Sequence, residues 1–386
     1  MTRRRTLPVG LPRRLAVTVA GPFVSVLLAL AVTALFLTAG GYSAASAFSV
    51  MWAYGVQPNS LVSSLNGAVP LYVAAVAGAF AVRMGLFNIG VDGQYRMAAL
   101  AGAVAAASLP FPLAVRLPLT LLIACAVGAG WALIPALLKI HRGVNEVITS
   151  ILLNAIATTI VAVLLSGVFR SGGGQNTGTA LIDDGGLMPA LPGVGTGQGS
   201  ISSFVVVALL AGIVYYLVIE RSVFGYSLRV AARSPEAAES AGIRVDRKIV
   251  QAMLISGAVA GLVGLPHILS VAGRFDGTLP TDLMFTGLAA TLLGRQHPIG
   301  MALGAFVLAF VERSAQVLGL VQLPTEVGQV FLAVVLLSSA VGYWLTERAD
   351  ARIALTLALR RRLRAARDAV APGASSTPTP TGGASR

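Results

Sequence analysis

The chain is poor in the residues that build disulfides, metal sites and phosphate loops. Its 386 residues include one cysteine, Cys125, which lies inside an apolar run and so excludes a disulfide scaffold and a cysteine metal cluster. The two lysines, Lys139 and Lys248, stand outside any G-x-x-x-x-G-K-[ST] sequence, so the chain is not itself a P-loop ATPase. Three scattered histidines predict no metal site, and the absence of G-x-S-x-G and H-E-x-x-H sequences disfavours a membrane enzyme.

Charged residues are also scarce. They make up 11% of the chain, against 56% hydrophobic residues, and the mean hydropathy is +0.81. Such a chain has too little polar surface to cover a soluble domain of its length, which indicates an integral membrane protein. Runs of about twenty apolar residues predict transmembrane helices, because a membrane barrel would show short alternating segments instead.

We therefore predict an all-α integral membrane protein with about ten transmembrane helices. They lie near residues 15–39, 61–82, 87–107, 117–138, 144–168, 203–219, 250–272, 283–294, 298–318 and 326–345. The eighth is short, which suits a half-helix that enters the bilayer without crossing it.

The net charge of +13 follows the expected topology. If the N-terminus is cytosolic, 23 Lys and Arg residues lie on the cytosolic face, three on the outer face and two inside spans. This asymmetry is the positive-inside pattern, so the charge indicates orientation and contact with anionic membrane lipid rather than with nucleic acid. Both termini are then cytosolic in a multi-pass protein.

The remaining organisation follows from composition. We expect a basic cytosolic N-terminus at 1–14, a transmembrane domain at 15–346, a basic amphipathic cytosolic segment at 347–370 and a disordered tail at 371–386. The apolar run after the basic N-terminus is too long for a cleaved signal, which favours a retained span. Within the domain, 170–202 is predicted to be an external Gly-rich loop and 220–249 a cytosolic loop. The GTGQG at 195–199 lacks the strand and helix of a nucleotide site.

Polar residues interrupt the apolar pattern at the start of the third span. Asn88, Asp92, Gln94 and Arg96 stand among glycines that permit a non-helical segment or a close helix crossing. Asp92 and Arg96 are four residues apart and share a helix face, where they can pair. Two interpretations stay open: a structural polar cluster at the interface, or part of the translocation path or its cytosolic gate.

Two further groups are candidates for the substrate path. Asn145 and Glu146 open the fifth span and Asn154 follows about two turns later, where polar side chains suit interhelical hydrogen bonds. Glu146 also suits the positive end of the helix dipole. Glu312 and Gln316 share a face of the ninth span near its outer end, where snorkelling to the interface is the simpler interpretation. Asp92, Glu146 and Glu312 are all predicted near span ends.

The most informative polar stretch is RSPEAAESAGIRVDRK, residues 233–248. Ser234 is a suitable N-cap, Pro235 fits the first helical position, and Glu236 follows in the first turn. Ala237 and Ala238 extend the helix and Gly242 ends it. A helix of about two turns is unstable alone in water, so it requires a partner surface, and its alanine face suits a groove on another protein.

Several motifs carry a resemblance to a known family. PEAAESAGI resembles the E-A-A-x-x-x-G cytosolic signature of bacterial ABC transporter permeases. GLFNIGVDGQYRMAALAGA, GVNEVITSILLNAIA and FTGLAATLLGRQHPIGMALGA resemble the branched-chain amino acid/ribose/nucleoside permease class, closest to its nucleoside permeases. The resemblance covers roughly residues 60–345. It departs from the general importer pattern after the Gly, where Gln251-Ala252-Met253-Leu254 stand in place of I-x-L-P.

The resemblance implies a permease subunit in a type II ABC importer-like arrangement, in a bacterial plasma membrane. It implies a second permease subunit, two cytosolic ATPase domains that use ATP, and an extracytoplasmic substrate-binding lipoprotein. The chain itself then binds no cofactor and no metal and is not an enzyme. Ser234, Pro235, Glu236, Ala237, Ala238 and Gly242 are implied to couple the chain to the ATPase.

Nucleosides are the expected substrate. A permease for ribose or another simple sugar is the alternative within the class, since Asn88, Asn154 and Gln316 suit either substrate. From other classes, an ion-coupled secondary transporter is next and a channel third. A secondary transporter would place a coupling carboxylate near mid-membrane, and the predicted positions at span ends count against it.

Overall fold

The structure is a computed structural model that describes residues 11–171, 178–191, 199–323 and 326–341. Within these ranges the chain forms helices and two isolated β-bridges and no strand, which confirms the all-α class. The predicted segments 347–370 and 371–386, and most of 1–14, lie outside the described residues.

The helices follow one another along the chain. They are α1 (Leu11–Ala39), α2 (Ala44–Gly55), α3 (Pro58–Arg83), α4 (Val91–Ser108), α5 (Leu113–Arg142), α6 (Glu146–Ser166), the 3₁₀ turn η1 (Asp184–Gly186), α7 (Phe204–Glu220), α8 (Val223–Arg233), α9 (Pro235–Ser240), α10 (Val245–Ala260), α11 (Leu265–His267), the π-helical η2 (Ile268–Ala272), α12 (Leu283–Leu293), α13 (Pro298–Ala315) and the 3₁₀ helix η3 (Gln316–Val321). The described chain ends in the helix Val327–Val341.

Six of the described helices are long and apolar enough to cross a membrane, and the pair α7 and α8, bent by 67°, adds a seventh. The six are α1, α3, α5, α6, α10 with its continuation to Ala272, and α13 with its continuation to Val321. α12 has 11 residues. Its length of about 16 Å is roughly half of the hydrocarbon thickness, as expected for the short eighth segment.

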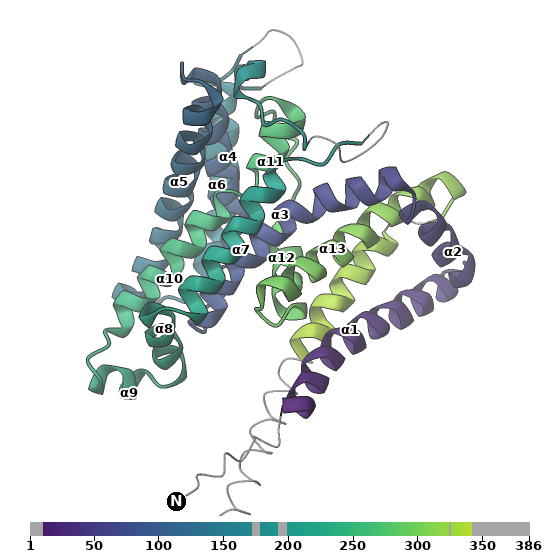
Figure 1. The fold of residues 1–386 in the computed structure, drawn as a ribbon, viewed down its shortest axis with the longest axis horizontal. Coiled ribbons are helices and arrows are strands. Elements are labelled where there is room, and N and C mark those ends of the chain that lie inside the picture. Colours follow the sequence, from purple (N-terminus) through teal and green to yellow (C-terminus); the bar gives the residue numbers. More distant parts are fainter. Residues whose placement is uncertain (1–10, 172–177, 192–198, 324–325, 342–386) are drawn as a thin grey trace, which may run out of the picture.

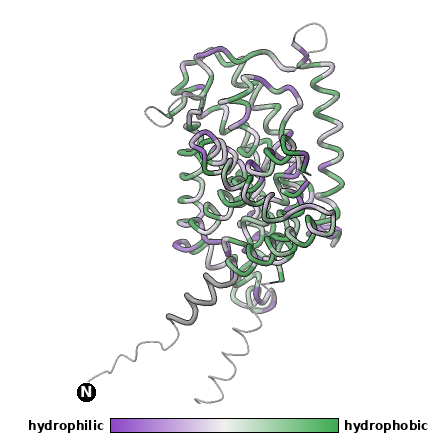
Figure 2. Tube along the Cα trace, turned by 90° about the vertical axis from the view of Figure 1, so that its right-hand side faces the viewer, coloured by the Kyte–Doolittle hydropathy of each residue, from purple (hydrophilic) through white to green (hydrophobic). Residues whose placement is uncertain are grey.

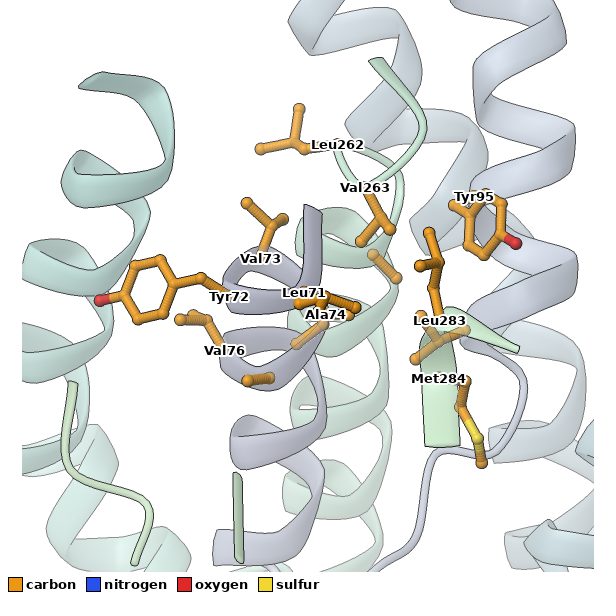
Figure 3. Close-up of a cluster of buried hydrophobic side chains, with 14 of the residues drawn as sticks. Leu71, Tyr72, Val73, Ala74, Val76, Tyr95, Leu262, Val263, Leu283 and Met284 are labelled. Carbon is orange, nitrogen blue, oxygen red and sulfur yellow. The ribbon is translucent and has the colours of Figure 1, made fainter. Parts of the chain in front are cut away.

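α3 is the central helix of the fold. It packs against α13 and α12 on one side and against α10 and α7 on others (Figure 1). Its residues from Leu71 to Ala81 are buried without interruption, because neighbouring helices surround it. Figure 3 shows Leu71 and Ala74 of α3 lying toward Leu283 of α12 and Tyr95 of α4, while Tyr72 points away from them. Tyr72 reaches α7, where its ring contacts the position of Gly212.

Small residues bring α5 and α10 together. Gly257 of α10 and Gly261, its C-cap, face Ala124, Gly128 and Ala132 of α5, so the two helices cross backbone to backbone. A Cβ on Gly257 would lie 2.6 Å from the carbonyl oxygen of Gly128, and one on Gly128 would lie 2.9 Å from the Cα of Gly261. Small residues four apart on both helices allow this approach, which gains van der Waals contact that lipid cannot replace. The contacts also show that α5 and α10 are antiparallel.

Gly128→Val is expected to destabilise the fold by about 3 kcal/mol, because the added side chain meets backbone that cannot move aside. Gly130→Val is the matched control, since no atom lies within 4 Å of a Cβ at that position. Thermal unfolding of the detergent-solubilised protein measures both. Equal unfolding midpoints for the two variants would contradict the close crossing.

The outer faces of several helices are apolar and exposed, as expected for contact with lipid. Phe23 and Leu35 of α1, Ile148 of α6, and Leu209 and Ile213 of α7 each expose about half or more of their surface. Figure 2 shows hydrophobic residues along most of the helical length. In a membrane protein such side chains face acyl chains, so their exposure needs no soluble partner.

Two helices were not predicted from the sequence. α2 begins after Ser43, whose side chain accepts a hydrogen bond from the Ser46 N–H, and it buries Ala47 and Met51 against Leu37 and Leu318. α8 occupies the first half of the predicted cytosolic loop at 220–249. α10 starts at Val245, so the basic residues that end this loop already belong to a helix. The loop is therefore mostly helical, because each short helix packs on its neighbours.

Candidate functional site

The short helix predicted at 234–242 is present as α9. The Ser234 Oγ accepts a hydrogen bond from the Ala237 N–H at 3.4 Å, and Pro235 is the first helical residue. Gly242 follows the C-terminus with φ +77°, a conformation that glycine adopts without strain. The predicted caps at both ends are therefore confirmed.

α9 lies at one end of the molecule, away from the rest of the bundle (Figure 1). It packs mainly on α8 and, to a smaller extent, on α10. Ala238 is fully buried in this contact, while Glu236, Ala237, Glu239 and Ser240 are exposed. A groove of about 510 Å³ lies directly beside it, between Glu239 and Arg247. One face of α9 thus holds it to the chain and the other is available to a partner.

Glu220 joins α8, and with it α9, to the bundle. It ends α7 at the 67° bend and pairs with Arg83 of α3 at 2.9 Å and with Arg229 of α8 at 3.8 Å. Arg83 also donates to the Tyr215 hydroxyl, which in turn donates to the Gln296 carbonyl at 3.0 Å. These side chains connect α3, α7, α8 and the turn between α12 and α13. The Glu220 network therefore links α8 to three other elements.

The polar segment before α4 is non-helical and tightly hydrogen-bonded. After α3 ends, Gly85 takes φ +78° and the chain turns back toward α4. Asn88 and Gln94 bond to each other through both amides at 2.9 Å, and both are buried. Asn88 also donates to Ser256 of α10. In this conformation the two amides hold the segment between α3 and α4 in place, and neither amide is exposed to a substrate path.

This segment lies level with the middle of α6, and not with its end. Asn154 accepts from the Gly93 N–H at 2.9 Å and donates to the Ile89 carbonyl at 2.8 Å. It stands eight residues after Glu146, the first residue of α6, which is about 12 Å along a helix. Asn154 is thus near the middle of the candidate span Glu146–Ser166, and Asp92, next to Gly93, lies level with it. Asp92 is the second residue of α4, so the prediction that it lies near the end of its helix is confirmed, and that end lies inside the bundle because the chain between α3 and α4 re-enters it.

Asp92 binds the start of α12. Its carboxylate accepts a hydrogen bond from the Met284 N–H at 3.2 Å, and the neighbouring Tyr95 hydroxyl donates to the Pro280 carbonyl at 2.5 Å. No ion pair joins Asp92 to Arg96 within the described chain; Arg96 lies over the Tyr95 ring at 5.7 Å. A carboxylate beside the first N–H groups of a helix is favourable, because the helix dipole is positive there.

A narrow cleft separates the 84–91 segment from α12. It is lined by Gly78 of α3, Phe87, Asn88 and Val91 of the segment, and Met284 and Leu288 of α12. Its volume is about 10 Å³, enough for one water molecule and too small for any organic substrate. Passage between these elements therefore requires them to separate.

Glu146 holds the turn between α5 and α6. The Asn145 side chain accepts from the Val147 N–H as the N-cap of α6, and Glu146 accepts from Lys139 at 2.6 Å. The Glu146 side chain is buried. Gly143, with φ +66°, ends α5 between them. These contacts fix the turn between α5 and α6 at the α9 end of the molecule.

Glu312 and Gln316 both lie exposed on the surface of the single chain. Gln316 accepts from Arg313 at 2.7 Å, and Arg313 lies over the Tyr54 ring of α2 at 5.5 Å. Within the described residues Glu312 forms no ion pair. An ionised side chain facing acyl chains costs roughly 2.5 to 3.5 kcal/mol on insertion scales, so water or another subunit is its expected neighbour.

At the end opposite α9, the described part of 170–202 packs on the bundle. Arg116 of α5 pairs with Asp183, and Ile182 donates to the Gly273 carbonyl at 2.8 Å. The next segment, 273–282, is ordered by Asp276. Burial raises the pKa of that carboxyl, but hydrogen bonds donated by Thr278 outweigh burial and hold the pKa below its ordinary value.

Comparison with known proteins identifies the family. Residues 60–340 match the family described as "Branched-chain amino acid transport system / permease component". The chain belongs to this permease family. A glucose ABC transporter permease of Haloferax volcanii is 34% identical over 321 residues, 81% of this chain and 83% of that protein. A guanosine ABC transporter permease of Bacillus subtilis is 32% identical over 333 residues, 83% and 93% of the two chains.

A nucleoside ABC transporter permease of Lactococcus lactis is 26% identical over 337 residues, 83% of this chain and 90% of that protein. No solved structure matches the permease. The permease is therefore an ABC transporter subunit and a multi-pass membrane protein. It is a transport component and not an enzyme, and the interpretation as an ion-coupled secondary transporter is set aside.

Asn154→Ala in the permease is expected to cost about 1–3 kcal/mol of stability, because it leaves the Gly93 N–H and the Ile89 carbonyl without their partner inside the bundle. Thr158→Ala is the control on the same helix, since its exposed hydroxyl bonds only to the carbonyl of residue 154. Unfolding midpoints in detergent measure the difference. A midpoint for Asn154→Ala equal to that of the control would show that this contact is unimportant.

Sequence reasoning missed several residues of these networks. Ser256 donates to the Ala77 carbonyl at 2.7 Å and accepts from Asn88, and Asp282 lies beside Asp92. Arg83 was counted only among the basic residues of the cytosolic face, and Glu220 was given no role. Asp282 could have been found from its position directly before α12, a helix too short to span the membrane. A carboxylate at such a position is well placed to contact other segments inside the membrane.

Proposed function

We propose that the permease forms the transmembrane path for nucleosides in an ABC importer. It works with a second permease subunit, two cytosolic ATPase domains and an extracytoplasmic substrate-binding lipoprotein. ATP is bound and hydrolysed by the partner, and this chain needs no cofactor of its own. The observation that carries the proposal is α9, a capped two-turn helix held by Ala238 and exposed on its other face.

In this proposal α9 lies in the cytosol of a bacterial cell and binds an ATPase domain. Arg229 and Arg233 of α8 and Arg244, Arg247 and Lys248 after α9 surround it with positive charge. Such charge favours the cytosolic side, so both termini are cytosolic as well. Closure of the ATPase domains on ATP then displaces α9 and α8, and the Glu220 contacts carry the displacement to α3 and α12.

Ten segments enter the membrane in this topology. The seven candidates named above are joined by α4, by α12 and by the helix Val327–Val341. α4 carries Asp92 and Arg96 and is accommodated because both lie against other helices. α12 is a half-helix whose N-terminus lies near the bilayer centre, an arrangement that transporters use where substrate passes.

Nucleoside is the proposed substrate because a guanosine permease and a nucleoside permease are similar to this chain over 83% of its length. A simple sugar is the second candidate, favoured by the 34% identity with a glucose permease. Uptake of radiolabelled guanosine and glucose by the native host, with and without the gene, separates the two. We expect guanosine uptake to require the gene and glucose uptake to continue without it. Gene-dependent uptake of glucose alone would replace nucleoside with sugar.

A further inference from the structure

The segment 276–282 runs into the membrane from the end opposite α9. It leaves the region where Phe275 pairs with Thr179 and reaches the first turn of α4, where Pro280 accepts from Tyr95. The carboxylate of Asp92 then binds the Met284 N–H of α12. Asp92 stands next to Gly93, which bonds to Asn154 about 12 Å along α6 from its start, so residues 280–285 lie level with the middle of that span.

Polar side chains are uncovered at this depth. Thr281 and Asp282 are exposed, and Phe285, one turn into α12, exposes 45% of its surface. An ionised carboxylate near the bilayer centre is costly when it faces acyl chains. Asp282 is therefore expected to face water or another subunit, and a water-filled path between subunits provides such a surface. Phe285 lies on the same uncovered surface.

The backbone at Asp282 holds the carboxylate in an uncommon conformation. Its φ of 61° is left-handed, a region that few residues other than Gly, Asn and Asp adopt. Such conformations persist where the surrounding structure fixes them, and they occur often at ligand sites. Here the Asp92 and Tyr95 contacts on either side fix the chain, so Asp282 is positioned and not mobile.

We infer that Asp282 and Phe285 form a substrate-selecting surface on the path, with the carboxylate of Asp282 accepting hydrogen bonds from ribose hydroxyls and the ring of Phe285 stacking on the nucleobase. This inference rests on the proposed function and adds the residues that recognise the substrate. A carboxylate can accept from two neighbouring hydroxyls at once, and charge-assisted bonds of this kind are strong. An exposed aromatic face favours a planar base, which stacks on it.

The cleft beside Met284 lies next to this surface. Its walls are the 84–91 segment and α12. When these elements separate, the Asp282 surface becomes continuous with the α9 end of the molecule. Asp92 and Arg96 lie near enough to interact electrostatically with each other, and Asp282 with Asp92. The Arg96 charge therefore partly offsets the charge of Asp92.

Comparing guanosine with 2′-deoxyguanosine tests the inference. In cells with the complete transporter we expect guanosine to be taken up about tenfold better, because its 2′-hydroxyl bonds to a carboxylate. Asp282→Asn is expected to bring this ratio close to one. Asn and Gly both adopt a left-handed backbone, so Asp282→Asn and Asp282→Gly are compatible with the native fold. Phe285→Leu is expected to weaken uptake of both nucleosides equally.

Asp184→Asn and Phe111→Leu are the controls, because both side chains are exposed at other positions. Each variant is first checked for its amount in the membrane. The wild type must first take up nucleoside. If Asp282→Asn and Phe285→Leu then show the same uptake and the same guanosine preference as the controls, the inference is wrong and the proposed function stands. If the wild type takes up no nucleoside, the proposed function fails and the inference with it.

Discussion

Glu236→Lys combined with Ala237→Glu is expected to abolish ATP-dependent uptake while the protein remains inserted in the membrane. Both side chains lie on the exposed face of α9, and neither contributes to the buried contact of Ala238 with the chain. The double variant changes the charge and size of that face, so a partner surface that fits it is lost. Uptake in cells and the amount of membrane-inserted protein measure the two effects.

Glu326→Lys is the control for this variant, because it reverses the charge of an exposed carboxylate away from α9. We expect it to leave uptake unchanged. Normal uptake by the α9 double variant would contradict the docking of α9, since an unrelated surface would then carry the coupling.

Glu220→Gln is expected to separate ATP hydrolysis from transport. The substitution keeps the size of the side chain and removes the charge that holds Arg83 and Arg229 together. α9 itself is untouched, so the ATPase still binds, but displacement of α8 reaches α3 less effectively. In the purified complex we expect near-normal ATP hydrolysis and at least a fivefold drop in substrate moved per ATP, about 1 kcal/mol of lost coupling.

Two variants control for a purely structural effect. Glu326→Gln makes the same chemical change at an exposed site. Arg83→Gln with Glu220→Gln removes both charges of the closer pair, so that Arg83 is not left as a charge without its carboxylate. A structural defect would be largely repaired in the double variant, whereas a coupling defect would persist. Unchanged transport per ATP in Glu220→Gln would remove Glu220 from the coupling route.

Local signals in the sequence predicted the parts of the fold that depend on few residues. Ser234, Pro235 and Gly242 act within one short helix, so their pattern was enough to predict α9 and both of its ends. Apolar runs predicted the long helices for the same reason. Asn145 was placed correctly at the start of α6, where its side chain is the N-cap.

The sequence did not predict contacts that join distant segments. Asp92 and Arg96 lie four residues apart in α4 as expected, but they form no ion pair in the described chain, and the hydrogen bond of Asp92 goes to Met284, 192 residues later. The depth of Asp92 depends on the contact of Asn154 with Gly93, which no local pattern encodes. The role of Gly128 is similar, because its importance comes from Gly257 and Gly261 on another helix. Each of these three contacts depends on how helices pack against one another, whereas local sequence patterns indicate only where a helix forms.

The central claim is that α9 binds a cytosolic ATPase domain, and site-specific crosslinking tests it most directly. A photo-crosslinking amino acid at Ala237 is compared with one at Ala53, which is exposed on α2. We predict that position 237 crosslinks to an ATPase subunit in cells and that position 53 does not. Transport-competent permease that gives no ATPase crosslink from position 237 would contradict the claim.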